Sequence, residues 1–337
     1  MIAPILLASI ISFFTVYFVA PSMKKFLERI DIIGTDQQKA GKPKMATSAG
    51  MLVIMGIVLG GFFFIGVNSF ILHYDINLEE LLAAYCSILI MVMIGFMDDI
   101  NIRRKPRSVK GIDDHRIGLK QWQKPLLTLP AAIPLMAVSA GVTEMFLPGI
   151  GSVDFGAIYP LIFIPLAVVV VSNATNMLAG SNGLEAGMGF VSMMALGFYS
   201  FSLGRYEASV IAFTTVFALL AFLRWNWFPA NFLPGDSLTY LIGAAFVSIV
   251  IIGNIEMFGM FVFIPWIIEF FLKLRSGFRA RSLGDLQKDG SLKAPYQKIH
   301  SLNHFIMKSG NINERQLTSI LILFEIGIVL LAFVLFL

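Results

Sequence analysis

The chain is poor in charge and has almost no cysteine. Only 14% of its 337 residues are charged and 57% are hydrophobic, whereas soluble globular domains carry about 25% charged and about 45–50% apolar residues. This excess of apolar residues excludes an ordinary soluble enzyme and a disordered chain. The single cysteine, Cys86, cannot form an internal disulfide, which excludes a secreted disulfide scaffold. The composition therefore predicts a protein with several membrane-spanning helices.

Long apolar runs occupy most of the chain. A helix needs roughly 20 mostly apolar residues to cross the hydrocarbon layer, and ten segments meet this requirement: residues 2–23, 48–72, 80–97, 125–143, 157–175, 186–203, 207–223, 237–254, 257–272 and 317–336. The stretches 144–156 and 224–236 are punctuated by Gly and Pro and are predicted turns. We expect one all-α integral membrane domain over residues 1–337, with ten transmembrane helices.

The basic residues fall almost entirely on one side of this topology. The loop after the first span holds six, the loop after the third holds eight, and the loop before the last holds nine. With Arg224, 24 of the 25 Lys and Arg residues share one side, and only Arg205 lies on the other. By the positive-inside rule the rich side is cytoplasmic. An even number of spans then places both termini outside the cytoplasm.

Two adjacent carboxylates mark the end of the third span, in the sequence IGFMDDINIRR. Asp98 and Asp99 leave the bilayer there, and such a pair is costly at a membrane edge unless it is solvated, paired or bound to a cation. A solvated helix end beside basic residues is one interpretation. A general base, or a site for a hydrated divalent cation, is the other.

Amides and glycines interrupt the end of the fifth span, in VSNATNMLAGSNGLEAGMGF. Asn173 and Asn176 are three residues apart and share a helix face, and Asn182 follows in a glycine-containing loop. Asn is unfavourable in a membrane helix unless its amide is satisfied. Such a loop could contact a base edge, phosphate oxygens or a metal ion, and the alternative is a polar re-entrant turn sealed by neighbouring helices.

Two more polar segments lie on the predicted cytoplasmic side. Asp236 starts the helix after RWNWFPANFLPG, where a carboxylate makes a good N-cap, but the acids and amides on the same side make it a candidate metal ligand as well. Arg275, Arg279 and Arg281 lie close together in RSGFRARSLGD. Arginine forks suit phosphate and pyrophosphate oxygens, and attraction to anionic lipid head groups is the alternative. No feature predicts nucleic-acid binding.

Four of these strings together resemble a known enzyme family. NATNMLAGSNGLEAG resembles the NAxNxxxGxNGLExG signature of the UDP-GlcNAc:dolichyl-phosphate N-acetylglucosamine-1-phosphotransferases. GFMDDINIR is similar to the DD motif of that family, NWFPANFLPGDSLTY to its NWYPxxxxxGDT segment, and GNINERQLT to its GPxHERNLT. The matches occur in the family's order over nearly the whole chain. The related bacterial polyprenyl-phosphate sugar transferases have a DGxDGL string where this chain has AGSNGL, so the resemblance favours an archaeal plasma-membrane enzyme.

The resemblance implies a glycosyl-1-phosphate transferase with its active site on the cytoplasmic face. The implied reaction transfers GlcNAc-1-phosphate from UDP-GlcNAc to a polyprenyl (dolichyl) phosphate, which gives lipid-PP-GlcNAc and UMP and begins lipid-linked oligosaccharide assembly for protein N-glycosylation. Mg²⁺ is the implied cofactor, with Mn²⁺ as an alternative, and membrane lipids and a second copy in a homodimer are the expected partners.

Three other functions compete with this one. A related transferase could use another UDP-N-acetylhexosamine for cell-surface polysaccharide. A secondary transporter would account for ionisable residues within or near spans, here Glu269 and Glu325. A structural scaffold would leave the four motifs unexplained.

The resemblance also implies roles for individual residues. Asn176 and Asp236 would coordinate the metal ion, Asn182 would contact the uracil, and Lys124 in LKQWQKPLL would hold the lipid phosphate. Asp98 and Asp99 would be catalytic, either as a general base or as the nucleophile of a covalent double displacement. The other implied substrate contacts are Thr35, Asp36, Gln37 and Thr47 near the nucleotide, Asn173 and Met177, and Arg279, Ala280 and Arg281 at the pyrophosphate and sugar.

The chain departs from the family's pattern at three positions. Ala280 stands where the family has the central His of an Arg-His-Arg triplet, and Thr47 stands where it has a glutamate. Leu233 takes the place of a base-stacking phenylalanine, for which the adjacent Phe232 is a candidate substitute. An insertion, roughly residues 103–118, separates the two aspartates from Lys124.

Overall fold

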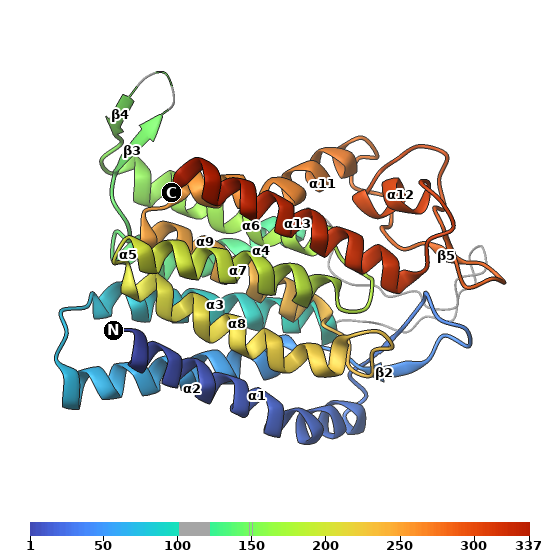
Figure 1. Ribbon diagram of the computed structural model, residues 1–337, viewed down its shortest axis with the longest axis horizontal. Coiled ribbons are helices and arrows are strands. Elements are labelled where there is room, and N and C mark those ends of the chain that lie inside the picture. Colours follow the sequence, from blue (N-terminus) through green and yellow to red (C-terminus); the bar gives the residue numbers. More distant parts are fainter. Residues whose placement is uncertain (101–121, 148, 150) are drawn as a thin grey trace.

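The computed structural model describes all residues except 101–121, 148 and 150. Its long helices run side by side along the longest axis of the molecule (Figure 1). In this described part, eight helices are long and apolar enough to cross a membrane, and a bent pair makes a ninth candidate. The eight are α1 (Ile2–Arg29), α2 with η1 (Gly50–Leu72), α3 (Leu78–Ile100), η3 with α6 (Tyr159–Met177), α7 (Leu184–Ser202), α8 (Tyr206–Asn226), α9 (Gly235–Gly253) and α13 (Glu314–Phe336).

The bundle is built around α9. The most apolar window of α9 is 89% buried, against 22% for α13 at the periphery. Glycines let two helices approach its first turn closely: a Cβ atom at Gly50 of α2 would lie 2.3 Å from the Ser237 carbonyl carbon, and one at Gly95 of α3 would lie 2.6 Å from its Cα. Large apolar side chains such as Phe18 and Leu330 remain exposed on the outer helices, as expected for a surface that faces lipid.

The fourth predicted span, residues 125–143, is not one helix. It consists of three short helices, α4 (Gln123–Thr128), η2 (Leu129–Ala132) and α5 (Ile133–Ala137). Pro130 and Pro134 stand at the starts of the second and third, because proline cannot supply the N–H that a continuous helix requires. Just beyond α5, the Gly141 N–H donates to Glu80 Oε1 at the start of α3 (3.3 Å).

The ninth predicted span, residues 257–272, is also broken. It comprises α10 (Glu256–Val262) and α11 (Ile264–Leu274), which meet at an angle of 60°. Pro265 lies in the first turn of α11, where its fixed φ suits a helix start. Because of this bend, α11 runs in a different direction from α10, and residues near its end, such as Lys273, line the polar cavity described below.

Short hairpins cover the two ends of the bundle (Figure 1). β1 (Ile33–Thr35) pairs with β2 (Lys44–Ala46), and β5 (Asp285–Leu286) pairs with β6 (Leu292–Lys293), near α12 (Leu302–Met307), at one end. The antiparallel hairpin β3 (Glu144–Leu147) and β4 (Gly151–Asp154) lies at the opposite end, where both chain termini also lie. This hairpin accounts for the predicted turn 144–156. The insertion around residues 103–118 lies outside the described residues.

Candidate active site

A cavity of about 850 Å³ opens at the end of the bundle that carries β1, β2, β5 and β6. Its walls come from α4, α6 and α9, from the loop between α6 and α7, and from the loop after α11. It gathers twelve of the fifteen predicted site residues: Thr35, Asp36, Gln37, Thr47, Lys124, Asn173, Asn176, Met177, Asn182, Asp236, Ala280 and Arg281. The other three, Asp98, Asp99 and Arg279, lie outside the lining that the described residues form.

Lys124 joins two carboxylates at one wall of this cavity. Its Nζ lies 2.6 Å from Asp98 Oδ2 and 2.8 Å from Asp236 Oδ2. The Asp98 side chain is only 3% exposed, whereas that of Asp236 is 31% exposed. Asp236 is therefore the carboxylate that is exposed to the cavity, whereas Asp98 contacts Lys124 from the buried side, away from the cavity.

Asp99 binds the backbone at the start of α9. Its Oδ1 accepts from the Asp236 N–H (2.8 Å) and its Oδ2 from the Ser237 N–H (3.2 Å). The first N–H groups of a helix have no partner within the helix, so the buried carboxylate supplies the cap. Gly235 makes the approach possible, since it has φ +69° and a Cβ there would lie 2.5 Å from Asp99 Oδ2. The interpretation of Asp236 as the N-cap is thus wrong: it lies in the first turn, which Asp99 caps.

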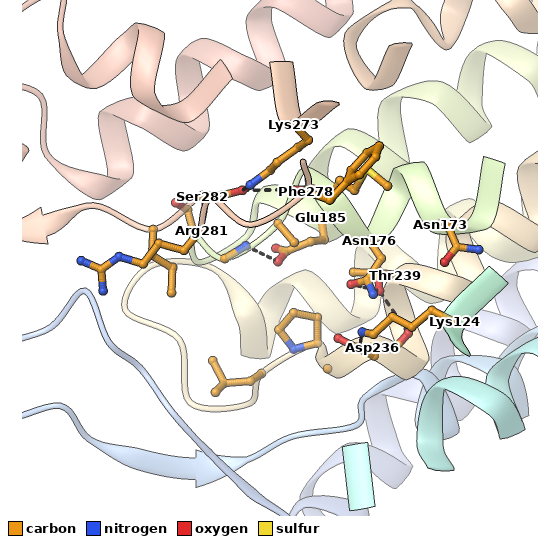
Figure 2. A pocket seen from close by; sticks show the side chains of 18 of the residues that line it. Lys124, Asn173, Asn176, Glu185, Asp236, Thr239, Lys273, Phe278, Arg281 and Ser282 are labelled. Carbon is orange, nitrogen blue, oxygen red and sulfur yellow. Dashed lines mark hydrogen bonds and ion pairs between the residues drawn. The ribbon is translucent and has the colours of Figure 1, made fainter. Parts of the chain in front are cut away.

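The two amides of α6 face the same wall, as their spacing predicted. Asn176 Oδ1 accepts from Thr239 Oγ1 (3.1 Å), and the same hydroxyl lies 3.0 Å from the Asp236 carbonyl oxygen. Asn173 Nδ2 donates to Thr128 Oγ1 (3.1 Å) and to the Val169 carbonyl (2.8 Å). Asn173 therefore joins α4 to α6, and Asn176 lies beside Asp236 through Thr239. Figure 2 shows Lys124, Asp236, Asn176 and Thr239 together on one side of the cavity.

Asn182 is tied into the cavity wall by its side chain. Its Nδ2 donates to Asp36 Oδ2 (3.0 Å), and its Oδ1 accepts from the Ala230 N–H (2.9 Å). Its own N–H donates to Glu314 Oε1 (2.7 Å). Lys39 forms ion pairs with both Asp36 and Glu314. Through its side chain and its backbone N–H, Asn182 thus connects its own loop to three segments that are far apart in the chain.

The loop that carries the arginines, residues 275–284 (the arginine loop), borders the cavity opposite Asp236. Ala280 is buried against the cavity, and Arg281 lines its edge while forming an ion pair with Asp285. Arg279 is exposed. In Figure 2, Lys273, Ser282 and Arg281 lie across the cavity from Lys124. The three arginines predicted together therefore do not share one position, and Arg281 is the one at the cavity.

Phe232, the candidate substitute for a base-stacking ring, does not reach the cavity, so that prediction is wrong. Phe232 is fully buried and packs edge-to-face against Phe222, with ring centroids 5.7 Å apart, whereas Leu233 lines the cavity. The aromatic rings that do line it are Trp122, Phe270 and Phe278, which come from the segment before α4, from α11 and from the loop after α11.

Several polar cavity residues were missed by the sequence reasoning. Glu185 is buried in the wall and its Oε1 accepts from the Gly180 N–H (2.7 Å), which fixes the α6–α7 loop. It stands inside the quoted NGLEAG string, so the motif contained the signal. Lys273 and Ser282 also line the cavity. The i,i+4 spacing of Glu269 and Lys273 at the end of a span was a readable sign of an ion pair.

The two acids that suggested a transporter differ in their surroundings. Glu269 accepts from Ser301 Oγ (3.1 Å) and from the Leu302 N–H (2.7 Å). Glu325, within α13, is fully buried, and both its carboxyl oxygens have no hydrogen-bond partner among the described residues. The polar cavity lies at an end of the bundle, whereas transporter sites lie near the bilayer midplane.

Comparison with known proteins identifies the family. Residues 81–254 match the glycosyl transferase family 4. A protein of Saccharolobus solfataricus is 34% identical over 95% of this chain and 93% of its own length, and its name is a provisional assignment as a UDP-N-acetylglucosamine–dolichyl-phosphate N-acetylglucosaminephosphotransferase. A Dictyostelium discoideum protein with that name is 25% identical over 92% of this chain and 82% of its own length.

A bacterial relative is more distant. A phospho-N-acetylmuramoyl-pentapeptide-transferase of Clostridium botulinum is 28% identical over 70% of each chain. The chain is thus a polytopic helical protein in which residues of the NATNMLAGSNGLEAG and NWFPANFLPGDSLTY motifs line one polar cavity. It belongs to glycosyl transferase family 4, and the resemblance predicted from its four motifs is confirmed.

Proposed function

We propose that the protein transfers GlcNAc-1-phosphate from UDP-GlcNAc to a dolichyl phosphate, with release of UMP. The observation that carries this proposal is the single cavity in which the residues of separate motifs meet, with Lys124, Asp236, Asn176 and Arg281 among its walls. The names of the archaeal and eukaryotic relatives support this pair of substrates. Transfer of another UDP-N-acetylhexosamine is the second candidate, and the bacterial relatives match less of the chain than the archaeal and eukaryotic ones do.

The chemistry brings two anions together, so neutralisation of charge and in-line positioning are its main demands. Lys124 supplies a cation for the lipid phosphate, and Arg281 supplies one for the pyrophosphate at the opposite wall. The second pKa of a phosphate monoester is about 6, so the attacking oxygen is mostly ionised at neutral pH. A strong base is therefore unnecessary, and direct displacement by the lipid phosphate is preferred to a covalent aspartyl intermediate.

Asn176 and Asp236 suit a magnesium ion that is also held by substrate. Among the described residues no group of three or more His, Cys, Asp and Glu side chains could hold a metal ion. Mg²⁺ commonly takes only one or two carboxylates from the protein and completes its shell with phosphate oxygens and water. The Asn176 amide oxygen and the Asp236 carboxylate, both in the cavity lining, fit such a partial site for Mg²⁺ or Mn²⁺. A bound divalent cation would neutralise charge on the pyrophosphate.

A second cavity of about 210 Å³ is a candidate site for the isoprenoid chain. It lies in the angle between α10 and α11, and its walls are almost entirely apolar side chains of α6, α9, α10 and α11. Ile267 lines this cavity, and Phe270, one helical turn further along α11, lines the main one. A chain whose phosphate lies at Lys124 could follow this apolar surface into the membrane.

We infer that the chain crosses the membrane ten times, with the main cavity facing the cytoplasm and both termini outside. The broken segment from α4 to α5 runs from the Lys124 cluster to Glu80 at the far end of α3, which supports counting it as a crossing. Both termini lie at one end of the bundle (Figure 1), as an even number requires. The described basic residues of the loop after α1 and of the loop before α13 lie at the cavity end, which supports a cytoplasmic location in the cell membrane.

The decisive experiment supplies the purified protein with UDP-GlcNAc, dolichyl phosphate and Mg²⁺, and measures UMP and the lipid product. Parallel reactions with UDP-GalNAc and UDP-glucose test the sugar. Lipid-PP-GlcNAc as the preferred product supports the proposal. Preference for another sugar supports the second candidate, and uptake of nucleotide sugar into proteoliposomes without UMP release would contradict both.

A further inference from the structure

A buried ion pair lies beneath the arginine loop, apart from the Lys124 cluster. Glu269 and Lys273 are one turn apart on α11, with Nζ and Oε1 3.7 Å from each other. Both residues are buried. Taking two charges out of water is expensive, so this pair requires further polar contacts to hold it there.

Lys273 binds the arginine loop directly. Its Nζ donates to the Ala280 carbonyl (2.8 Å) and to Ser282 Oγ (2.6 Å). Figure 2 shows this side chain reaching Ser282 at the cavity wall. An ammonium has three N–H donors; the arginine loop engages two of them, and the Glu269 carboxylate lies 3.7 Å away. Most of the hydrogen-bonding capacity of Lys273 is therefore directed at the loop.

The other ends of the network reach two more elements. Ser282 Oγ lies 3.0 Å from the carbonyl oxygen of Met177, at the end of α6. Glu269 Oε2 accepts from Ser301 Oγ and from the Leu302 N–H, at the start of α12. One buried pair thus joins the arginine loop to α6 on one side and to α12 on the other.

We propose that the Glu269–Lys273 pair is a positioning device that fixes the arginine loop against the cavity and thereby sets the affinity for the nucleotide sugar. Fully satisfied buried networks rigidify the segments they join. Arg281 adjoins Ala280 and Ser282, both of which Lys273 holds, so loss of the pair displaces its guanidinium from the pyrophosphate. Lys124 is held by Asp98 and Asp236 instead, so the lipid-phosphate side is unaffected. This inference rests on the proposed function.

The test compares Lys273→Met, Glu269→Gln and the double variant with the wild-type protein in detergent. Each is assayed for the KM of UDP-GlcNAc at saturating dolichyl phosphate and for the KM of dolichyl phosphate at saturating UDP-GlcNAc. Misplacement by 1 Å can cost about 100-fold, so we expect the nucleotide-sugar KM to rise about 10- to 100-fold. The lipid-phosphate KM should stay within about twofold, and the double variant should match the single ones.

A second readout does not depend on activity. Trypsin cleavage after Arg275, Arg279 and Arg281 reports how firmly the arginine loop is held, and it should accelerate at least about tenfold in each variant. Ser282→Ala keeps the ion pair but removes its link to α6, so cleavage should accelerate less than in the other variants. This milder variant keeps the test valid if Lys273→Met or Glu269→Gln folds poorly. Glu325→Gln, a buried acid outside the network, is the matched control and should leave both readouts unchanged.

The outcomes separate the two proposals. If the wild type makes no lipid-linked product, the proposed function fails, while accelerated cleavage still supports the positioning role. Unchanged cleavage and unchanged KM values in Lys273→Met would overturn that role. An equal rise in both KM values would overturn it too, because it would indicate general loss of structure.

Discussion

Replacement of Asp99 by Asn tests which of two adjacent aspartates takes part in the reaction. In the structure Asp99 accepts from two backbone N–H groups at the start of α9, and Asp98 binds Lys124. An asparagine keeps one acceptor but turns an NH₂ group toward the other N–H. Because hydrogen bonds to a charged group contribute about 1.5–3 kcal/mol each, the loss of one should destabilise the protein by about that amount.

The effect on turnover should be indirect. The cap holds the first turn of α9, which presents Asp236 to the cavity, so a small displacement should lower kcat by up to about 100-fold without abolishing it. The pH dependence of the remaining activity should be that of the wild type. Asp98→Asn should instead lower kcat by about 10²–10⁴-fold if Asp98 assists removal of the phosphate proton. Activity of that variant should recover in part above the second pKa of the phosphate, about 6, since the dianion then predominates.

The assay measures initial rates of UMP release between pH 5 and 9, together with the midpoint of thermal unfolding of each variant. Asp99→Asn should shift the midpoint more than Asp98→Asn does. The reasoning is refuted if Asp99→Asn has wild-type stability and no turnover at any pH. A phosphorylated or glycosyl-phosphorylated aspartate trapped without lipid would refute it as well, because it would establish the covalent route.

Further predictions concern the metal ligands, the orientation and the Asn182 cluster. Asp236→Ala should abolish turnover while membrane insertion and folding stay intact. EDTA should abolish the activity of the wild type until Mg²⁺ or Mn²⁺ is added back, and full activity in the chelator would contradict the metal site. With Cys86 replaced, cysteines at Lys293 and at Lys110, which lies outside the described residues, should be labelled only from the cytoplasm. Cysteines at Asp75 or Asp154 should be labelled only from outside. Labelling at position 293 in right-side-out vesicles would overturn this orientation. Asn182→Ala should destabilise the protein by about 1–3 kcal/mol because the buried Ala230 N–H loses its partner and Asp36 loses one of its contacts, and an unchanged unfolding midpoint would contradict this.

Twelve residues named from the sequence line one cavity, and most of them come from strings with a recognisable pattern. Sequence reasoning could not tell which of Asp98 and Asp99 faces Lys124. Successive residues of a helix point about 100° apart, so adjacent acids necessarily have different neighbours, and only the packing of α3 against α9 decides which. The same holds for Arg279 and Arg281, since the course of an irregular loop determines which one reaches the cavity.

Contacts between distant segments were the other part that sequence could not supply. Glu314 was quoted only as part of a motif, yet it accepts from the Asn182 N–H and pairs with Lys39. Its place follows from the capping box of Asn313 and Gln316, which starts α13 one residue before it. By contrast, the break of the fourth span could have been predicted, because Pro125, Pro130 and Pro134 recur within one segment.

A last prediction concerns Glu325, whose replacement should change the stability of the protein but not its activity. Its carboxyl group is fully buried in α13 and has no hydrogen-bond partner among the described residues. A buried polar group left unpaired costs about 1–3 kcal/mol, whereas leucine at this position would bury apolar surface of similar size. Glu325→Leu should therefore raise the midpoint of thermal unfolding, by up to that free energy, and leave the rate of UMP release unchanged, since the residue lines neither cavity. Acids within membrane spans are often retained for function. A variant that is more stable but inactive would show that this carboxyl group has a role in the reaction cycle, while an unstable variant would show that Glu325 has a partner in the folded protein.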